Sequence, residues 1–184
     1  TTYPESEKTQ LVIEAAKGER ISIRVRYPSW ATSGAKVTIN GKQLAVKTKP
    51  GNYIGLTRIW QKGDIIEVSY PMSLHLIPAN DNPHIAAIAY GPIIHVGVMG
   101  NEGVLPPAPY APNQLDYADY AIPKDLIYSI VTHGEPVSKW VKPVANTEPL
   151  TFEVVGQEGS KKLRLIPYYR LHHQRYVLYW NLEF

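Results

Sequence analysis

The sequence predicts an all-β protein made of two antiparallel β-sandwich domains in tandem, with little helix. First, short runs rich in β-branched residues recur from Gln10 to Ile77, separated by Gly, Pro, Asn and Lys. Second, one run alternates apolar and polar residues without a break, and another contains an Asn-Gly pair, which is typical of a hairpin. Third, the sequence has no heptad pattern, no repeat of fixed period and no apolar run that approaches a membrane span.

The alternating run at residues 21–27 predicts a strand that buries Ile21, Ile23 and Val25 and ends at Pro28. A hairpin is predicted at residues 37–46, because both centres of a type I′ turn need positive φ and Asn40-Gly41 tolerates it. Further strands are predicted at residues 53–56, 64–70 and 73–77.

After residue 78 the pattern changes. Residues 85–90 and 93–98 are apolar almost throughout, which predicts strands covered on both faces. Residues 100–112 are rich in Pro and Gly and predict a linker, so we expect one domain at residues 1–99 and a second, smaller one at 100–184. In the second domain we expect a helical turn at 116–120 and strands at 126–132, 151–155, 162–166 and 175–182.

Composition excludes several classes of function. With 44% hydrophobic residues the chain has enough apolar surface for a core, and a net charge of +3 without a basic run does not predict a nucleic-acid-binding protein. The absence of cysteine excludes disulfides, thiolate nucleophiles and Cys-ligated zinc.

The densest polar cluster lies at residues 168–176 and holds two His, two Arg and three Tyr. If the segment is extended, the adjacent His172 and His173 face opposite sides and do not easily share a metal ion. The other four His are scattered, so no metal site is predicted. The cluster could hydrogen-bond a sheet edge or a neighbouring domain, or contact a sugar or another partner.

A glycosidase needs two carboxylates roughly 5 to 9.5 Å apart. The pairs Asp116–Asp119 and Asp64–Glu67 are the nearest in sequence, but neither lies in a run that predicts an apolar pocket, and solvated surface positions explain them. There is no G-x-S-x-G elbow and no phosphate-binding glycine motif. We assign no catalytic residue.

Aromatic rings are the remaining candidates, because sugars stack their C–H faces on Trp and Tyr. Core packing is the competing explanation for every Trp, including Trp180 in its apolar run. The candidates for carbohydrate or domain contacts are Trp30, Trp60, Trp140, Tyr169, Arg170, His172, His173 and Arg175.

Several stretches resemble the C-terminal region of glycoside hydrolase family 127, the β-L-arabinofuranosidase-like enzymes. The R-Y-P-S-W-A stretch at residues 26–31 and P-M-S-L at 71–74 are specific as a set, whereas N-G-K and W-x-x-G-D recur in unrelated sandwiches. The resemblance extends over the stretches at residues 3–6, 23–31, 37–42, 60–64, 70–74, 89–92 and 168–180.

The resemblance implies an (α/α) barrel that carries the active site and is followed by two β-sandwich domains. The family's zinc-bound Cys nucleophile and its acid/base Glu belong to that barrel, so this chain, which lacks cysteine, is expected to hold no cofactor of its own. The partners implied are the chain's own catalytic barrel and, as further options, a plant-type glycan or a second copy in a homodimer. Neither nucleic acid nor membrane is expected, and periplasmic or secreted residence is implied by the resemblance alone.

Three hypotheses follow. The leading one is a non-catalytic fragment, cut from a longer polysaccharide-degrading hydrolase, that buttresses or docks on the barrel; the apolar stretch at 85–98 would then form an exposed docking patch. The second is a carbohydrate-binding module that contacts arabinose-containing glycans through exposed aromatics such as Trp30 and Tyr169. The third is a hydrolase in its own right that uses carboxylates such as Asp81 or Asp116.

Overall fold

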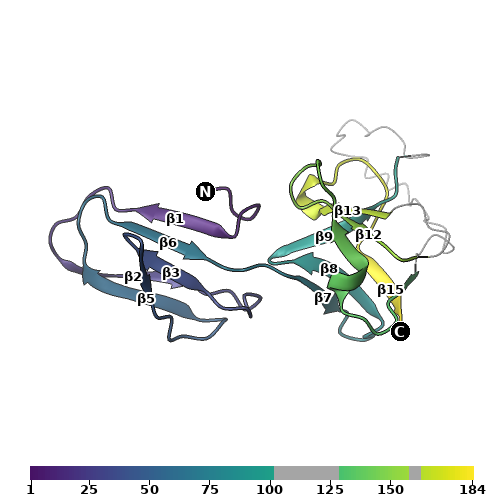
Figure 1. Cartoon of the computed structure of the whole chain (residues 1–184), viewed down its shortest axis with the longest axis horizontal. Coiled ribbons are helices and arrows are strands. Elements are labelled where there is room, and N and C mark those ends of the chain that lie inside the picture. Colours follow the sequence, from purple (N-terminus) through teal and green to yellow (C-terminus); the bar gives the residue numbers. More distant parts are fainter. Residues whose placement is uncertain (102–128, 158–162) are drawn as a thin grey trace, which may run out of the picture. The chain divides into compact units, whose positions relative to one another are not determined.

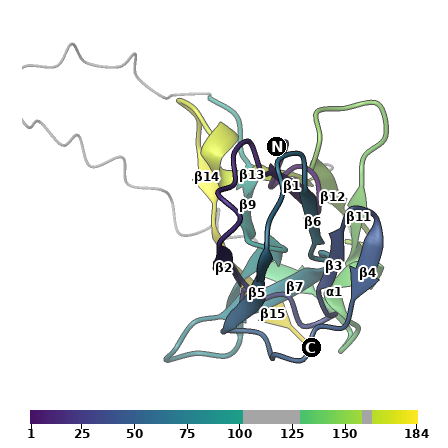
Figure 2. The same cartoon turned by 90° about the vertical axis from the view of Figure 1, so that its left-hand side faces the viewer.

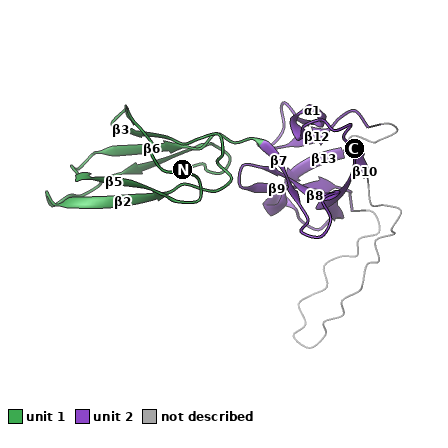
Figure 3. Ribbon diagram, turned by 90° about the horizontal axis from the view of Figure 1, so that it is seen from below, with its two compact units in different colours: residues 1–73 green, residues 74–184 purple. Residues whose placement is uncertain are grey.

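The structure, a computed structural model, describes residues 1–101, 129–157 and 163–184. Regular structure in these ranges is almost all strand, with one short helix α1 (Val137–Trp140) and one 3₁₀ turn η2 (Tyr168–Arg170), so the all-β prediction is confirmed. No helix in the described ranges is long and apolar enough to cross a membrane. The chain divides into two compact units, residues 1–73 and 74–184, which are coloured separately in Figure 3.

Unit 1 is a sandwich of two sheets (Figure 1), which appear as separate layers in Figure 3. One sheet has the order β1 (Lys8–Val12), β6 (Ile65–Ser69), β3 (Lys36–Ile39) and β4 (Lys42–Leu44). Figure 2, in which this unit faces the viewer, shows β4 beside β3. The other sheet pairs β2 (Arg20–Arg26) with β5 (Tyr53–Ile59). Both sheets contribute to one core, whose buried members are Tyr27, Ala31, Val37, Ile39, Ile54, Leu56, Trp60, Ile66, Val68 and Tyr70.

The Asn-Gly hairpin is confirmed. Asn40 and Gly41 adopt φ of 50° and 76°, and β3 and β4 pair across them. The Asn40 side chain also reaches the neighbouring turn: its Nδ2 donates to Asp64 Oδ1 at 2.8 Å, and its Oδ1 accepts from the Ile65 amide at 2.8 Å. Asp64 Oδ2 accepts from the Gln61 amide at 2.9 Å. The W-x-x-G-D motif therefore forms a structural turn that is hydrogen-bonded to the hairpin.

Replacing Asn40 with alanine is expected to destabilise unit 1 by about 1 to 2 kcal/mol, because it removes two hydrogen bonds and strains a left-handed backbone position. Urea unfolding measures the change. Asn40→Gly keeps the backbone conformation accessible and isolates the hydrogen bonds, and the exposed Gln43→Ala in β4 serves as control. Equal stability of wild type and Asn40→Ala would contradict the role assigned to this side chain.

Unit 2 contains one branched sheet of nine strands instead of two separate sheets, because β8 and β9 each have three partners. Its main path runs β10 (Ser129–Val131), β15 (Tyr179–Glu183), β8 (Ile85–Tyr90), β9 (Ile93–Val98), β13 (Leu163–Pro167), β12 (Phe152–Val154) and β11 (Val141–Pro143). β7 (Leu74–Pro78) adds to β8 and β14 (Tyr176–Val177) adds to β9. All pairs are antiparallel except β10 with β15.

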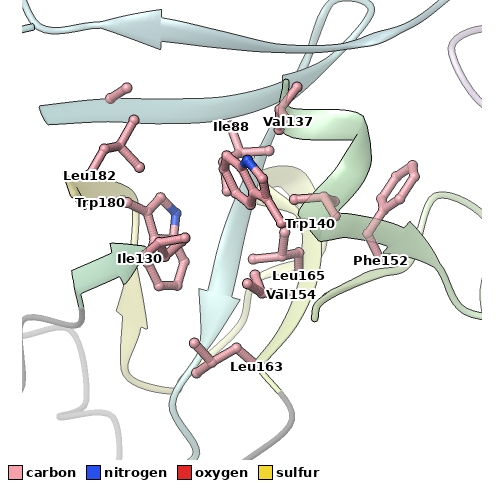
Figure 4. Packing of buried hydrophobic residues seen from close by; sticks show 12 residues of the cluster. Ile88, Ile130, Val137, Trp140, Phe152, Val154, Leu163, Leu165, Trp180 and Leu182 are labelled. Carbon is pink, nitrogen blue, oxygen red and sulfur yellow. The ribbon is translucent and has the colours of Figure 1, made fainter. Parts of the chain in front are cut away.

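The apolar run at residues 85–98 forms β8 and β9, and the prediction that both faces are covered is confirmed for the central residues of each strand. The core against which they pack is shown in Figure 4, where the Trp180 ring lies beside Ile130. The buried members of this core are Ala86, Ile88, Ile130, Val137, Trp140, Val141, Phe152, Val154, Leu163, Leu165, Trp180 and Leu182.

The expected domain boundary between residues 99 and 100 is corrected to 73 and 74. β8 pairs with β15, and β9 pairs with β13 and β14, so the strands after residue 73 complete their sheet only with the end of the chain. The second unit is therefore the longer one. The linker predicted at 100–112, the helical turn at 116–120 and part of the strand at 126–132 lie outside the described residues.

Candidate functional site

The structure separates the tryptophan candidates. Trp60 and Trp140 are 3% and 4% exposed, and their indole N–H groups donate to backbone carbonyls of their own units. Neither ring is open to a sugar, so core packing is the correct explanation for both. Trp30 is half-buried and packs edge-on against Tyr70 at 6.1 Å. Trp180 is fully buried.

The polar cluster at residues 168–176 is not one extended strand. Tyr168–Arg170 forms η2, and His173 then has φ of 44°, so the alternation of faces expected for a strand does not apply. His172 and His173 are exposed, with ring centroids 6.2 Å apart. Arg175 is exposed, and its backbone amide donates to the Gly100 carbonyl at 2.8 Å.

Tyr169 and Arg170 do come together. The Arg170 guanidinium lies 5.5 Å from the centroid of the Tyr169 ring, and the Tyr169 side chain is 54% exposed. Arg170 Nη1 also donates to the Pro149 carbonyl and lies 3.7 Å from Glu148 Oε2. An exposed ring beside an anchored cation is a suitable platform for the C–H face of a sugar.

Arg170 is one of four side chains that hold the loop between β11 and β12. Thr147 Oγ1 donates to the Val144 carbonyl at 2.9 Å, and Thr151 Oγ1 donates to the Glu148 carbonyl at 2.7 Å. Arg170 donates to the Pro149 carbonyl, and His95 Nε2 lies 3.0 Å from the Leu150 carbonyl. Four backbone carbonyls of one loop therefore contact side chains. These contacts stabilise the loop, residues 144–151, in which Asn146 and Leu150 have positive φ.

His95 has no exposed surface, and its Nδ1 and Nε2 lie 3.1 and 3.0 Å from the carbonyls of Ile93 and Leu150. Burial lowers the pKa of His95, and although both carbonyls oppose this shift, the Arg170 charge reinforces it. The ring is therefore neutral near pH 7, and it packs edge-on against Phe152 at 5.1 Å. Its place in the core makes it a structural group and not an acid or base.

A cavity of about 430 Å³ lies beside this loop. Two guanidinium groups, two hydroxyls, one carboxylate and one aliphatic side chain surround it, which together offer donors and acceptors to a polar ligand. Its lining residues are Thr147, Glu148, Thr151, Arg164, Ile166 and Arg170. The loop was not recognised from sequence; the signal available was a run of Thr and Pro between two short strands.

Two further exposed tyrosines lie in the same segment as Tyr169. Tyr168 and Tyr176 are 50% and 39% exposed, and their ring centroids lie 5.9 Å apart. The hydrogen bond from Tyr168 raises the pKa of Tyr176, with burial and the Tyr168 charge adding to the effect. The Tyr176 phenol is therefore neutral at physiological pH.

The carboxylates considered as candidates differ in their surroundings. Asp64 is the one buried carboxylate in the described part of the chain, and its two oxygens are engaged by Asn40 and Gln61, whose hydrogen bonds hold the Asp64 pKa below its usual value. Such a group is ionised and is a poor proton donor. Asp81 is exposed, whereas Asp116 and Asp119 lie outside the described residues.

No three His, Asp or Glu side chains gather into a metal-binding group anywhere in residues 1–101, 129–157 and 163–184. The zinc that the family resemblance implies for a catalytic barrel has no fitting donor set there, since the chain also lacks cysteine.

Comparison with known proteins finds similarity to one enzyme family. Residues 1–72 match the model described as the GH127 middle domain of β-L-arabinofuranosidase, and residues 122–182 match a model described as a domain of unknown function. The resemblance to glycoside hydrolase family 127 is confirmed. No curated protein matches the chain.

Solved structures of larger GH127 proteins share the fold. The whole chain matches 30% of a GH127 β-L-arabinofuranosidase from Geobacillus stearothermophilus T6, with 20% identity and a TM-score of 0.64. It matches 31% of a second GH127 β-arabinofuranosidase, with 16% identity and a TM-score of 0.65, and 32% of a protein titled glycoside hydrolase, with 19% identity and a TM-score of 0.65. The chain thus spans about a third of the length of these three structures.

Proposed function

We propose that this chain is a non-catalytic accessory region of a GH127-type, polysaccharide-degrading glycoside hydrolase, which buttresses or docks on a separate catalytic barrel. The observation that carries the proposal is that the entire chain matches about a third of larger glycoside hydrolases, and residues 1–72 match the family model of a GH127 middle domain. The catalytic machinery that the family resemblance implies, a zinc-bound Cys, has no counterpart in a chain without cysteine.

The surface used for docking differs from the one first expected. β8 and β9 are buried within unit 2 itself, so the apolar stretch at residues 85–98 offers no open patch. The exposed rings of Tyr168, Tyr169 and Tyr176 are better candidates for the docking surface. Tyrosine is enriched at protein–protein interfaces, and these three rings are accessible to a partner.

The test is calorimetric titration of the chain with the separately produced barrel of a GH127 β-L-arabinofuranosidase. We expect binding to the barrel and no hydrolysis of an aryl β-L-arabinofuranoside by the chain alone. Tyr169→Ala should weaken binding about tenfold, as expected for an aromatic anchor, whereas the exposed His172→Ala should not. Hydrolysis by the purified chain, or no binding to the barrel, would overturn the proposal.

A second candidate function is supported by the cavity beside Arg170. A carbohydrate-binding module would stack arabinose-containing glycans on Tyr169 and hold their hydroxyls with Arg170 and the threonines of the loop at 144–151. Titration with arabinofuranosyl oligosaccharides in the absence of a barrel decides between the two functions. Binding that Tyr169→Ala and Arg170→Ala abolish would favour the binding module.

A further inference from the structure

The outer face of the β2–β5 sheet in unit 1 carries a separate arrangement of charge. Directly opposed residues of an antiparallel pair share one face, and the register opposes Arg20 to Ile59, Ser22 to Thr57, Arg24 to Gly55 and Arg26 to Tyr53. The intervening residues Ile54 and Leu56 are buried in the core. All eight residues of the first set are exposed, so they form the solvent face, which we call the arginine face.

The arginine face is positively charged and carries no carboxylate. Its four β2 residues include three arginines, and the β5 residues opposite are uncharged. Within residues 1–101, 129–157 and 163–184, no carboxylate forms an ion pair with Arg20, Arg24 or Arg26. Residues two apart on a strand are about 7 Å apart, so the three guanidinium groups form a line about 20 Å long.

The neutral half of the face suits a sugar chain. The Tyr53 ring is 54% exposed and lies 5.1 Å from the Arg26 guanidinium, which gives a platform with a fixed cation at its side. Next to it, Gly55 leaves open space where a side chain would stand. Beyond Gly55, Thr57 Oγ1 donates to Ser22 Oγ at 2.9 Å, which places two hydroxyls in the same line.

We propose that the arginine face binds an acidic polysaccharide, in which sugar rings stack on Tyr53 and successive carboxylates of uronate residues pair with Arg26, Arg24 and Arg20. Guanidinium groups match carboxylates in a two-point geometry, and the surplus of positive charge is uncompensated within the described structure. The site differs from the Tyr169–Arg170 cavity in unit, in charge and in the ligand that it selects.

An acidic protein segment is the competing occupant, because it also supplies carboxylates. The structure favours the glycan, since the face presents an open aromatic ring, a gap at Gly55 and a hydroxyl pair in one row. The site could not be recognised from the sequence, because the arginines alternate with uncharged residues and never form a basic run.

The experiment titrates the whole chain with polygalacturonate at low and at physiological salt. We expect binding to weaken as salt rises. The double variant Arg24→Ala/Arg26→Ala should lose about tenfold in affinity, because it removes two exposed, salt-screened ion pairs with the ligand. Tyr53→Ala should weaken binding several-fold without changing the charge. The matched control is Lys36→Ala/Lys42→Ala, which removes the same charge from the other sheet of unit 1 and should bind as wild type.

Ligand controls separate the possible occupants. Fully methyl-esterified polygalacturonate and neutral arabinan should bind at least tenfold more weakly, because they lack the carboxylates. Poly-L-glutamate that binds as tightly as polygalacturonate, with Tyr53→Ala unaffected, would overturn the assignment in favour of an acidic protein partner. Equal losses in the arginine and lysine double variants, or no binding to polygalacturonate, would also overturn it.

Discussion

Gly97→Ala is expected to destabilise unit 2 by about 3 kcal/mol. A Cβ added at Gly97 would stand 2.4 Å from Cη2 and 2.5 Å from Cζ2 of Trp180, and 3.2 Å from Met99 Cε. Neither the β9 backbone nor the Trp180 ring can move away easily. Gly97 in β9 is paired with both Leu165 and Val177, and Trp180 is fully buried. Overpacking of a closed core typically costs about 1 to 3 kcal/mol, and this contact is at the severe end of that range.

The contact can be tested with a second substitution. Trp180→Phe removes the six-membered ring atoms that meet the new Cβ, together with an indole N–H that has no hydrogen-bond partner among the described residues. We expect Gly97→Ala/Trp180→Phe to be more stable than the sum of the two single changes predicts, as measured by a double-mutant cycle in urea. The control Gly55→Ala, on an open strand position, should change stability by less than about 0.5 kcal/mol. Additive single and double variants would contradict the proposed clash.

His95→Ala is expected to cost about 2 to 4 kcal/mol. The substitution leaves a cavity beside Phe152 and removes the one ring N–H that bonds a carbonyl, that of Ile93 or that of Leu150. Calorimetric or urea unfolding measures the loss, and the exposed His172→Ala should be neutral.

The pH dependence of stability gives an independent signature of His95. Its pKa is lowered by burial in the folded state, so the unfolded chain binds the proton more readily. The free energy of unfolding should therefore fall as the pH drops through the ordinary histidine value of about 6.5, until the lower folded-state pKa is reached. His95→Ala should lack this part of the pH dependence, whereas His172→Ala should retain it. An unchanged pH profile in His95→Ala would show that the ring is not buried in its neutral form.

Local chemistry predicted much of the fold. Asn40-Gly41 has one low-energy way to reverse two strands, and the runs at 85–90 and 93–98 become β8 and β9 at the bounds expected from the Gly-Pro break between them. In each case the determining interaction lies within a few residues of the sequence.

Interactions between distant residues could not be predicted in the same way. The position of the unit boundary depends on the pairing of β8 with β15, which lies about ninety residues later in the sequence. The residues near position 73 contain no pattern that predicts this pairing. Likewise, the exposure of Trp60 and Trp140 depends on core neighbours from other strands, and the cavity beside Arg170 depends on a loop twenty residues away in sequence. The sequence identified these side chains as candidates for contacts, but it did not predict which residues surround them in the fold.

The late closure of the unit 2 sheet determines the order in which this chain can fold during synthesis. The unit 1 strands of this chain pair with one another before residue 74, so these pairings can form once residue 73 has left the ribosome, whereas β8 and β9 must wait for β13, β14 and β15. During that interval the apolar stretch at 85–98 is uncovered, with unpaired strand edges that can associate with other nascent chains. The last strand, β15, therefore protects the chain against aggregation as well as completing its core.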